Sequence, residues 1–427
     1  MFGKKKLDVV VIGAGPVGLF AALVLARQGI HPQILDKEWR PGAHSYALAL
    51  HGQSLRLLEE VGLLPRIVEK GYEVSGIRLY AKSGRKAEIR WQRSGNTVPL
   101  LMVLRQDVLE SLLADALADF GVQVLWNHQA SRLVPQPDKV VVAIDKLQKE
   151  SAGYAVAHTE WVVAKSMECE ASFVVGADGH DSYVRRSAGI EFPPVGEPEC
   201  YAVFELGSDV DLNHEMRIVM GDRTTDAIWP LPEGCCRWSF QLPGLMVPED
   251  SRTKDRLVIS VGGTELPVLS EASLRALIAE RAPWFAGDIR EMHWQVAVRF
   301  ERRLASIFGR ERIGLAGDAA HLTGPVGMQS MNIGLREARD LAEVISRALH
   351  EGEPTEPLKA YNARSLARWR RLLGLDDGLE CSEGTSPWVR RHKDRFLSCL
   401  PAYGADFADF AGQIGLRATQ SAVRGDR

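Results

Sequence analysis

The sequence predicts an α/β protein whose N-terminal part forms a doubly wound parallel sheet. Three observations support this fold class. Residues 9–12 are β-branched and apolar on both faces, as expected of a buried parallel strand. Residues 16–27 then show helical spacing, and residues 32–35 form a second short apolar run. This strand, helix and strand make a βαβ unit, which commits the start of the chain to a parallel sheet.

The length and composition indicate a globular protein with two domains. The chain has 427 residues, and a single hydrophobic core stops growing at roughly 250–300 residues. Apolar residues make up 45% and charged residues 25%, which excludes a disordered or collagen-like chain. The net charge of -3 supplies no field that would attract nucleic acid or an anionic membrane.

Further elements follow from apolar periodicity along the chain. Helical patterns are expected within residues 47–69 and over 106–119, and a small antiparallel meander over 131–161. Buried strands are expected at 173–179 and 312–316, with several strands between 199 and 300. Amphipathic or helical patterns close the chain at 332–349, 357–375 and 388–400.

These segments predict that the first domain is discontinuous in sequence. We expect it to comprise residues 1–75, 100–190 and 300–350. Residues 76–99 and 191–299 are expected to form an inserted domain built on a mixed β-sheet, because aromatic and β-branched residues recur there at strand spacing. Residues 351–427 are expected to form a C-terminal helical segment.

The cysteines and the N-terminus indicate a cytoplasmic protein. The six cysteines include no CxxC pair and no cluster at zinc spacing, so reduced thiols are expected. The basic N-terminus precedes an apolar run, as in a secretory signal, but Gly13 interrupts that run after about five residues. No apolar stretch approaches the roughly 18 residues of a membrane span.

A glycine loop after the first strand has the context of a dinucleotide site. Gly13, Gly15 and Gly18 form a GxGxxG pattern between a strand and a helix, and Asp36 follows at the end of the next strand. Gly13 permits a tight turn, Gly15 lets the backbone approach a pyrophosphate, and Gly18 allows the helix to pack closely on the strand. Asp36 would accept hydrogen bonds from a ribose. This fingerprint alone leaves FAD and NAD both open.

Two later motifs place an aspartate between small residues at a strand end. The first is VVGADGHDSYVR, residues 174–185, and the second is GLAGDAAH, residues 314–321, which PVGMQSMN follows at 325–332. Together with the glycine loop, these motifs resemble those of the class A flavin-dependent monooxygenases, the p-hydroxybenzoate hydroxylase-like aromatic hydroxylases. The resemblance covers most of the chain up to about residue 375.

The resemblance implies FAD as the cofactor and assigns residues to it. Asp318 would hold the ribityl hydroxyls, Arg105 would reach the flavin chain and pyrophosphate, and Asp178 with Arg185 belong to a motif linked to FAD and NADPH. N–H groups of the loop before the helix at 332 would stabilise charge on the flavin ring. The full set of expected cofactor-binding residues is Gly13, Gly15, Pro16, Val17, Gly18, Asp36, Lys37, Arg105, Asp178, Arg185, Gly317, Asp318, Pro325, Gly327, Met328, Gln329, Ser330, Met331 and Asn332.

The sequence departs from the family pattern in the last loop. The family usually has PxGGQGxN, whereas Met328 and Ser330 stand here at two of the glycine positions. Residues with a β-carbon avoid positive φ, so we expect a less mobile loop and hence a less mobile flavin. The usual arginine after the second strand is absent from residues 44–48. No second GxGxxG exists, so NAD(P)H is expected to bind transiently, as an electron donor without its own domain.

The implied chemistry is hydroxylation of an aromatic or heteroaromatic small molecule by NAD(P)H and O2 through a C4a-hydroperoxyflavin. The inserted domain would provide an apolar wall over the flavin, with Trp229, Trp238, Phe240, Trp294 and Phe300 as candidates. No metal site is expected, and the chain would be a monomer or a homodimer. Candidate substrates are a phenol, an aminoaromatic, a quinolone and a polyketide-derived ring. Candidate substrate-pocket residues are His44, Tyr46, Trp229, Arg237 and Gln295.

Two other interpretations stay open at this point. The same scaffold could carry a flavin-dependent epoxidase or a halogenase, although the halogenase WxWxIP signature is missing. A flavoprotein that binds FAD or an aromatic ligand as a sensor or assembly partner, without oxygenating anything, belongs to another class. Substrate-stimulated NAD(P)H oxidation with a mass gain of one oxygen would separate these cases.

Overall fold

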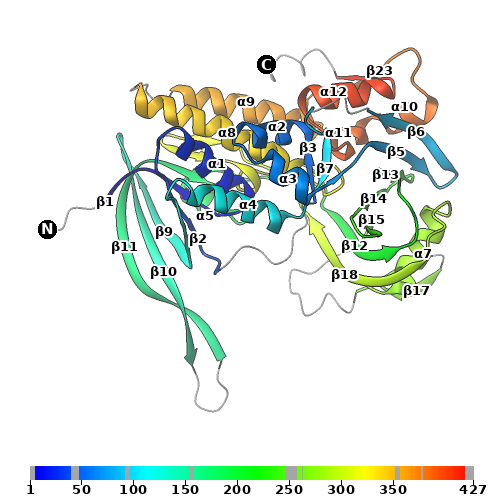
Figure 1. Ribbon diagram of the computed structural model, residues 1–427, viewed down its shortest axis with the longest axis horizontal. Helices are drawn as coiled ribbons and strands as arrows, with labels where there is room; N and C mark the ends of the chain where they lie inside the picture. Colours follow the sequence, from blue (N-terminus) through cyan, green and yellow to red (C-terminus); the bar gives the residue numbers. More distant parts are fainter. Residues whose placement is uncertain are drawn as a thin grey trace.

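A computed structural model gives the fold, and it describes residues 5–39, 48–91, 97–152, 158–245, 257–261, 263–351, 356–376 and 378–418. Two large β-sheets lie side by side, with helices along one edge of both (Figure 1). The first sheet belongs to the segments predicted for the discontinuous domain. The second is built mainly from residues between 199 and 300. The boundaries between the two domains remain a prediction.

The first sheet has a parallel centre, as predicted. Its strand order is β20-β21-β11-β1-β2-β8, and every neighbouring pair except β20 with β21 is parallel. The strands of this path are β1 (Lys5–Ile12), β2 (Gln33–Asp36), β8 (Val124–Trp126), β11 (His158–Gly176), β20 (Gly309–Arg310) and β21 (Ile313–Leu315).

Helices cover this parallel centre. Helix α1 (Pro16–Arg27) has the predicted bounds and is buried along almost its whole length, which fits its mostly apolar sequence. It packs against α4 (Gln106–Ala118) and α8 (Gln329–His350), and α8 packs in turn on α9 (Glu356–Leu372). The helical pattern within 47–69 divides into α2 (Gly52–Glu60) and α3 (Leu64–Lys70), because Gly62 turns the chain with φ 81°.

The predicted meander is confirmed, but its last strand is longer than expected. Strands β9 (His128–Pro135), β10 (Val140–Ala152) and β11 pair antiparallel in order. The first half of β11 pairs with β10 and its second half pairs with β1, so a single strand joins the meander to the sheet. The meander extends away from the body as an arm (Figure 1).

The second sheet has seven strands in the order β18-β12-β15-β14-β13-β5-β6. All pairs are antiparallel except β13 with β5. Two of these strands, β5 and β6, come from residues 76–90, within the segment 76–99 that was expected to join the later strands. The strands are β5 (Gly76–Ala81), β6 (Gly84–Arg90), β12 (Glu199–Ser208), β13 (Glu215–Met220), β14 (Thr225–Pro230), β15 (Cys235–Gln241) and β18 (Ile289–Phe300).

The two faces of the second sheet have different neighbours. One face packs under α7 (Glu271–Arg281), with Phe204, Trp238 and Phe240 in a common core with Leu274 and Leu277. The hairpin β16 (Val258–Val261) and β17 (Thr264–Pro267) lies beside that helix. The opposite face, here called the inner face, shares a core with residues around the loop before α8 and with the C-terminal segment.

The C-terminal segment covers the inner face rather than extending from the body. The pattern predicted over 388–400 is broken into α10 (Pro387–His392), the 3-10 helix η2 (Lys393–Arg395) and α11 (Phe396–Cys399). Helix α12 (Gly404–Gln413) and the strand pair β23 (Leu379–Cys381) and β24 (Leu416–Ala418) were not predicted.

Short elements connect these layers. Strands β3 (Ala49–His51), β7 (Leu101–Val103) and β4 (Tyr72–Glu73) form a small sheet, and β19 (Arg303–Leu304) pairs with β22 (His321–Leu322). The short α5 (Tyr183–Ser187) and the 3-10 helix η1 (Gly317–Ala319) follow strand ends of the first sheet. Within the described residues, no helix is both long and apolar enough to span a membrane.

Candidate functional site

The three sequence motifs meet at the carboxyl ends of the central parallel strands. Ile12, Gly176 and Leu315 lie in register on β1, β11 and β21. A β-carbon at Gly13 would collide with the Ala177 carbonyl of the second motif, and one at Gly18 would collide with the Gly13 carbonyl beside the Ala177 side chain. Carboxyl ends of parallel strands are where ligands bind in open α/β sheets.

The third motif packs directly on the first. The side chain of Val17 lies against Gly317 and Gly334, and a side chain at either glycine would meet it. Segments that are about 300 residues apart in sequence therefore form one continuous surface. The structure brings the motif residues together as the sequence predicts.

The start of helix α1 has the properties of an anion site. Gly15 is its N-cap residue, no side chain of the described residues caps it, and its first turn holds no acidic residue. A β-carbon at Gly15 would meet no atom within 4 Å, so the space beside it is open. Free N–H groups and the positive end of the helix dipole at such a start favour a phosphate.

Asp36 holds the glycine loop from the neighbouring strand. Its Oδ2 accepts a hydrogen bond from the Ala14 N–H at 2.7 Å, and its Oδ1 accepts one from the Glu38 N–H at 2.9 Å. A carboxylate oxygen has a second lone pair, so Asp36 keeps the capacity to accept from a ribose. Its contact with a nucleotide, and that of Lys37, remain predictions.

Asp178 and Arg185 are engaged within the protein. Asp178 accepts hydrogen bonds from Ser182 Oγ at 2.5 Å and from the Val184 N–H at 3.0 Å, which secures the start of α5. Burial raises the pKa of the Asp178 carboxyl, and these hydrogen bonds oppose the rise. Arg185 is buried, donates to the Ala319 carbonyl at 2.9 Å and stacks over Phe192 at 3.9 Å. It thereby ties the second motif to the third.

The loop before α8 leads into a second uncapped helix start. Met328 is the N-cap residue, and its φ of 52° is left-handed despite its β-carbon. Residues with a β-carbon were expected to avoid positive φ, but Met328 adopts the left-handed conformation that glycine favours. This conformation costs a residue with a β-carbon about 1–2 kcal/mol. Asp318 is exposed beside this start and accepts from Ser330 Oγ at 2.5 Å.

Gln329 and Asn332 hold the loop in place with their side chains. Gln329 Nε2 donates to the carbonyls of Leu400 and Ala402 in the C-terminal segment, at 2.6 and 3.0 Å. Asn332 Nδ2 donates to the carbonyls of Ala49 and Met328. Both side chains are fully buried. Any contact that these residues make with a cofactor would therefore come from their backbone.

His51, which the sequence did not mark as a site residue, also holds this loop through hydrogen bonds. Its backbone N–H donates to Asn332 Oδ1 at 2.8 Å, and its Nε2 donates to the Gly327 carbonyl at 2.9 Å. Its Nδ1 is buried without a hydrogen-bond partner among the described residues. A buried histidine with one satisfied nitrogen favours the neutral form.

The stability of the protein should therefore fall in mild acid through His51. Burial lowers the pKa of His51 to about 3, against 6.5 for the free side chain. Between these values the unfolded chain binds the proton and the folded protein does not, so the free energy of unfolding decreases as the pH falls below about 6.5, by about 2 kcal/mol at pH 5.

Urea unfolding at about pH 7.5 and pH 5 measures this loss. His51→Gln keeps a donor for Gly327 without titrating, and it should lose about 2 kcal/mol less than the wild type between the two pH values. His350→Gln, at the exposed end of α8, is the control and should behave as the wild type. Equal losses in all three proteins would contradict the assignment.

A charged row crosses the inner face of the second sheet. Glu205 pairs in register with Arg237 and with Trp294, and Arg237 pairs with Trp229. Arg237 Nη2 donates to Glu205 Oε2 at 2.8 Å, and its guanidinium lies over the Trp294 ring at 5.3 Å. Arg105 reaches this row from the start of α4, with Nη1 3.7 Å from Glu205 Oε1. Glu205 thus links a predicted cofactor residue to a predicted pocket residue.

The predicted pocket residues do not all share this face. Trp229 lies on the inner face but is fully buried in its core. Gln295 pairs with Phe204, so it points to the α7 side, and directly paired residues of a sheet share a face. Trp238 and Phe240 pack under α7 as well. These three therefore do not line the wall that the sequence suggested. His44 and Tyr46 lie outside the described residues.

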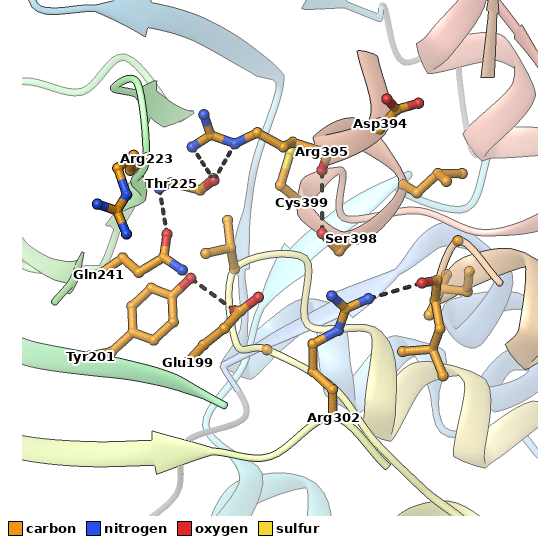
Figure 2. A pocket seen from close by; sticks show the side chains of 16 residues that line it. Glu199, Tyr201, Arg223, Thr225, Gln241, Arg302, Asp394, Arg395, Ser398 and Cys399 are labelled. Atoms are coloured by element: carbon orange, nitrogen blue, oxygen red, sulfur yellow. Dashed lines mark hydrogen bonds between the residues drawn. The ribbon is translucent and has the colours of Figure 1, made fainter. Parts of the chain in front are cut away.

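A cavity of about 280 Å³ lies where the inner face, the loop before α8 and the C-terminal segment meet (Figure 2). Its wall is mixed, with charged, hydroxyl and apolar side chains from seven parts of the chain. The lining residues are Glu199, Tyr201, Arg223, Thr225, Gln241, Arg302, Gly324, Val326, Leu372, Leu373, Gly374, Asp394, Arg395, Leu397, Ser398 and Cys399.

Sequence reasoning missed the polar groups of this cavity. Tyr201 Oη donates to Glu199 Oε2 at 3.3 Å, and the Glu199 carboxyl lies against Gly324, where a side chain would collide with it. Burial raises the pKa of Glu199, whereas Arg302 lowers it. The available signal was the carboxylate of Glu199 at the start of a mostly apolar strand, because a buried charge requires a partner.

Arg395 closes the cavity from the C-terminal segment. It donates to the Gly221 carbonyl at 2.7 Å, to the Thr224 carbonyl and to Thr225 Oγ1, so it clamps the turn between β13 and β14. Gly327 packs so tightly on Ser398 that a β-carbon would collide with its carbonyl oxygen. The segment therefore holds both the sheet and the loop.

Comparison with known proteins identifies the family. A family model described as an FAD binding domain matches residues 6–375. The chain belongs to this FAD-binding family. The match ends at residue 375, within the C-terminal segment, so five residues of the cavity wall, from Asp394 to Cys399, lie outside it.

Relatives and solved structures agree with this membership. The chain is 28% identical over 361 residues to an uncharacterized aromatic compound monooxygenase of Bacillus subtilis, and 27% identical over 363 residues to a rifampicin monooxygenase of Streptomyces venezuelae. These alignments cover 84% and 83% of the chain, but only 65% and 67% of the relatives. The chain thus spans about two thirds of their length.

A solved structure has the same fold. The p-nitrophenol 4-monooxygenase of Pseudomonas putida superposes with a TM-score of 0.68 at 22% identity, over 86% of both chains. This likeness confirms the predicted fold class of an FAD-binding α/β domain with a second sheet and C-terminal helices.

The described residues fit FAD as the cofactor of this family. The open space beside Gly15 and the uncapped start of α1 suit a pyrophosphate. The exposed carboxylate of Asp318 suits hydroxyl groups, and the uncapped start of α8 offers N–H groups to a ring edge. Which atom of FAD each residue contacts remains a prediction.

Proposed function

We propose that this protein is an FAD-dependent monooxygenase that uses NAD(P)H and O2 to hydroxylate a compact aromatic or heteroaromatic molecule. One observation carries the proposal. The loop at residues 325–328 joins the FAD motifs to the inner face, since Val326 and Met328 share its core with Tyr201, Val203 and Trp229. A flavin ring held at the start of α8 would face the sheet across this loop. When bound, FAD would supply the oxygen-transfer chemistry.

The cavity beside the loop is the proposed seat of the substrate. A cavity of about 150 Å³ accepts a benzene ring, so 280 Å³ suits one or two fused rings. Glu199 and Tyr201 would orient a substrate hydroxyl or amine, and Arg302 would face an acidic substituent. Packing by Arg395, Ser398 and Cys399 would exclude water during the reaction. A cytoplasmic location is part of the proposal and is supported by the six free thiols.

The test is a screen of phenols, aminoaromatics, quinolones and polyketide-derived rings with the FAD-loaded protein. We expect one compact compound to accelerate NAD(P)H consumption and to gain the mass of one oxygen from ¹⁸O-labelled O2. A product that gains a halogen would indicate a flavin-dependent halogenase instead of a hydroxylase. An epoxide product would indicate an epoxidase. Tight binding of an aromatic compound without any product would favour a sensor.

A further inference from the structure

A buried chain of hydrogen bonds runs inward from the exposed carboxylate of Asp318. Ser330 Oγ lies 2.5 Å from Asp318 Oδ1 and 3.4 Å from His321 Nδ1. His321 Nε2 lies 2.8 Å from Glu337 Oε2, and both of these side chains are fully buried. The chain connects the surface at which FAD is expected with the interior of the protein.

At the inner end of this chain, further contacts fix the side chains of Glu337 and His321. Glu337 Oε2 also accepts from the Gly317 N–H at 3.0 Å, and Oε1 accepts from Trp369 Nε1 at 2.6 Å. The His321 ring stacks on Trp369 with centroids 3.7 Å apart. A carboxylate with three donors is an acceptor only, so His321 must carry its proton on Nε2.

At the outer end, the contact between Ser330 and His321 depends on whether His321 Nδ1 carries a proton. A carboxylate can only accept, so the hydroxyl proton of Ser330 points to Asp318. Ser330 can then only accept from His321, which requires a second proton, on Nδ1. With neutral His321, the Nδ1 lone pair competes with Asp318 for the hydroxyl proton. The 3.4 Å separation is that of a loose contact.

We propose that Ser330 and His321 form a positioning chain that holds the Asp318 carboxylate for FAD, and that this hold strengthens when His321 takes a second proton. The charged groups that face His321 are Glu337 from α8 and, through Ser330, Asp318 from η1; Trp369 of α9 and Phe308 face it with their rings.

The proposal rests on the assignment of Asp318 to FAD and not on hydroxylation. If protonation of His321 strengthens FAD binding, then FAD binding must increase the proton affinity of His321 by the same factor. Protons are then taken up when FAD binds. This linkage gives a readout that a purely structural role for Ser330 would not change. No turnover is needed to observe it.

The experiment measures the Kd of FAD by fluorescence titration from about pH 6 to pH 9, and proton uptake by calorimetry in buffers of different ionisation enthalpy. We expect the wild-type Kd to rise with pH by roughly tenfold or more, as for the loss of one hydrogen bond to a charged group. Ser330→Ala should bind FAD about tenfold more weakly at pH 6, with a flat pH profile and no linked proton uptake. Ser330→Thr keeps the hydroxyl and should restore both.

Ser346→Ala removes a hydroxyl from the same helix, away from Asp318, and should behave as the wild type. Asp318→Asn tests the underlying assignment separately. If Asp318→Asn leaves the Kd unchanged, the residue does not hold FAD and the proposal falls with that assignment. If Asp318→Asn weakens binding but Ser330→Ala keeps the wild-type Kd and pH profile, the positioning chain is refuted. His321→Gln should also show a Kd of FAD that does not change with pH. If the His321→Gln protein does not fold, the result for Ser330→Ala decides the test.

Discussion

Gly15→Val is expected to abolish FAD binding while the protein without FAD remains folded. Gly15 has an ordinary extended backbone, with φ -72° and ψ 179°, and its missing β-carbon faces open space. A valine fits there when the site is empty. It would occupy the space through which a pyrophosphate must approach the N–H groups of α1. We expect the Kd of FAD to rise more than 100-fold, which corresponds to at least about 2.7 kcal/mol.

Two measurements check this expectation. Flavin absorbance after gel filtration reports bound FAD, and thermal unfolding of FAD-free protein reports the fold. The loss of a glycine N-cap should cost no more than about 1–2 kcal/mol. Gly384→Val is the matched control, because a β-carbon there also meets open space, far along the chain from the motifs. A Gly15→Val protein that retains flavin would refute the pyrophosphate site.

Gly13→Ala should behave in the opposite way and damage the fold itself. Gly13 has φ 104°, and its β-carbon would collide with the Ala177 carbonyl. Both the backbone strain and the clash oppose the turn between β1 and α1. The contrast between the two variants separates a glycine needed for a ligand from one needed for packing. The sequence pattern alone predicts both roles, and the positions of the neighbouring atoms make them testable.

The parts of the fold that depend on local pattern could be predicted from the sequence. Helix α1 has the predicted bounds because Pro16 opens it and an apolar run continues through it. The convergence of the motifs was also predictable, because each follows a buried strand and parallel strands end at one edge. The meander is clear from its alternating pattern, although the union of two apolar runs into β11 was not.

The elements that depend on distant contacts could not be predicted. Helix α12 has glycine at its first position and a weak pattern; it is held by Asp406, which pairs with Arg56 at 2.8 Å, and by Phe410, which stacks on Trp91. Strand β14 ends in Pro230, which suggests a loop until its partner β15 is known.

The candidate site shows the same division. The cofactor residues belong to contiguous motifs and were found together. The substrate-side residues lie on separate strands, and whether Trp229 or Trp238 faces the flavin side depends on strand register, which is set by pairing. Part of the cavity wall comes from α11, which no motif marks. A pattern confined to one strand cannot show which side that strand turns toward the flavin domain.

Glu337→Leu is expected to be among the most destabilising single changes in the chain. Glu337 is fully buried and accepts from the Gly317 N–H, from His321 Nε2 and from Trp369 Nε1. Leucine fills a similar volume but leaves three buried donors without an acceptor. At about 1–3 kcal/mol for each unsatisfied donor, the loss of unfolding free energy should be roughly 3–9 kcal/mol.

The same change should also weaken FAD binding, because the Gly317 N–H is held by Glu337 immediately before Asp318. Chemical denaturation of FAD-free protein measures the stability, and a fluorescence titration measures the Kd of FAD. Glu343→Gln is the control on the same helix. It removes only a half-exposed ion pair with Arg339 and should cost less than about 1 kcal/mol. Equal stability losses for the two variants would mean that the buried carboxylate does not organise the third motif, and that Asp318 is positioned by the backbone alone.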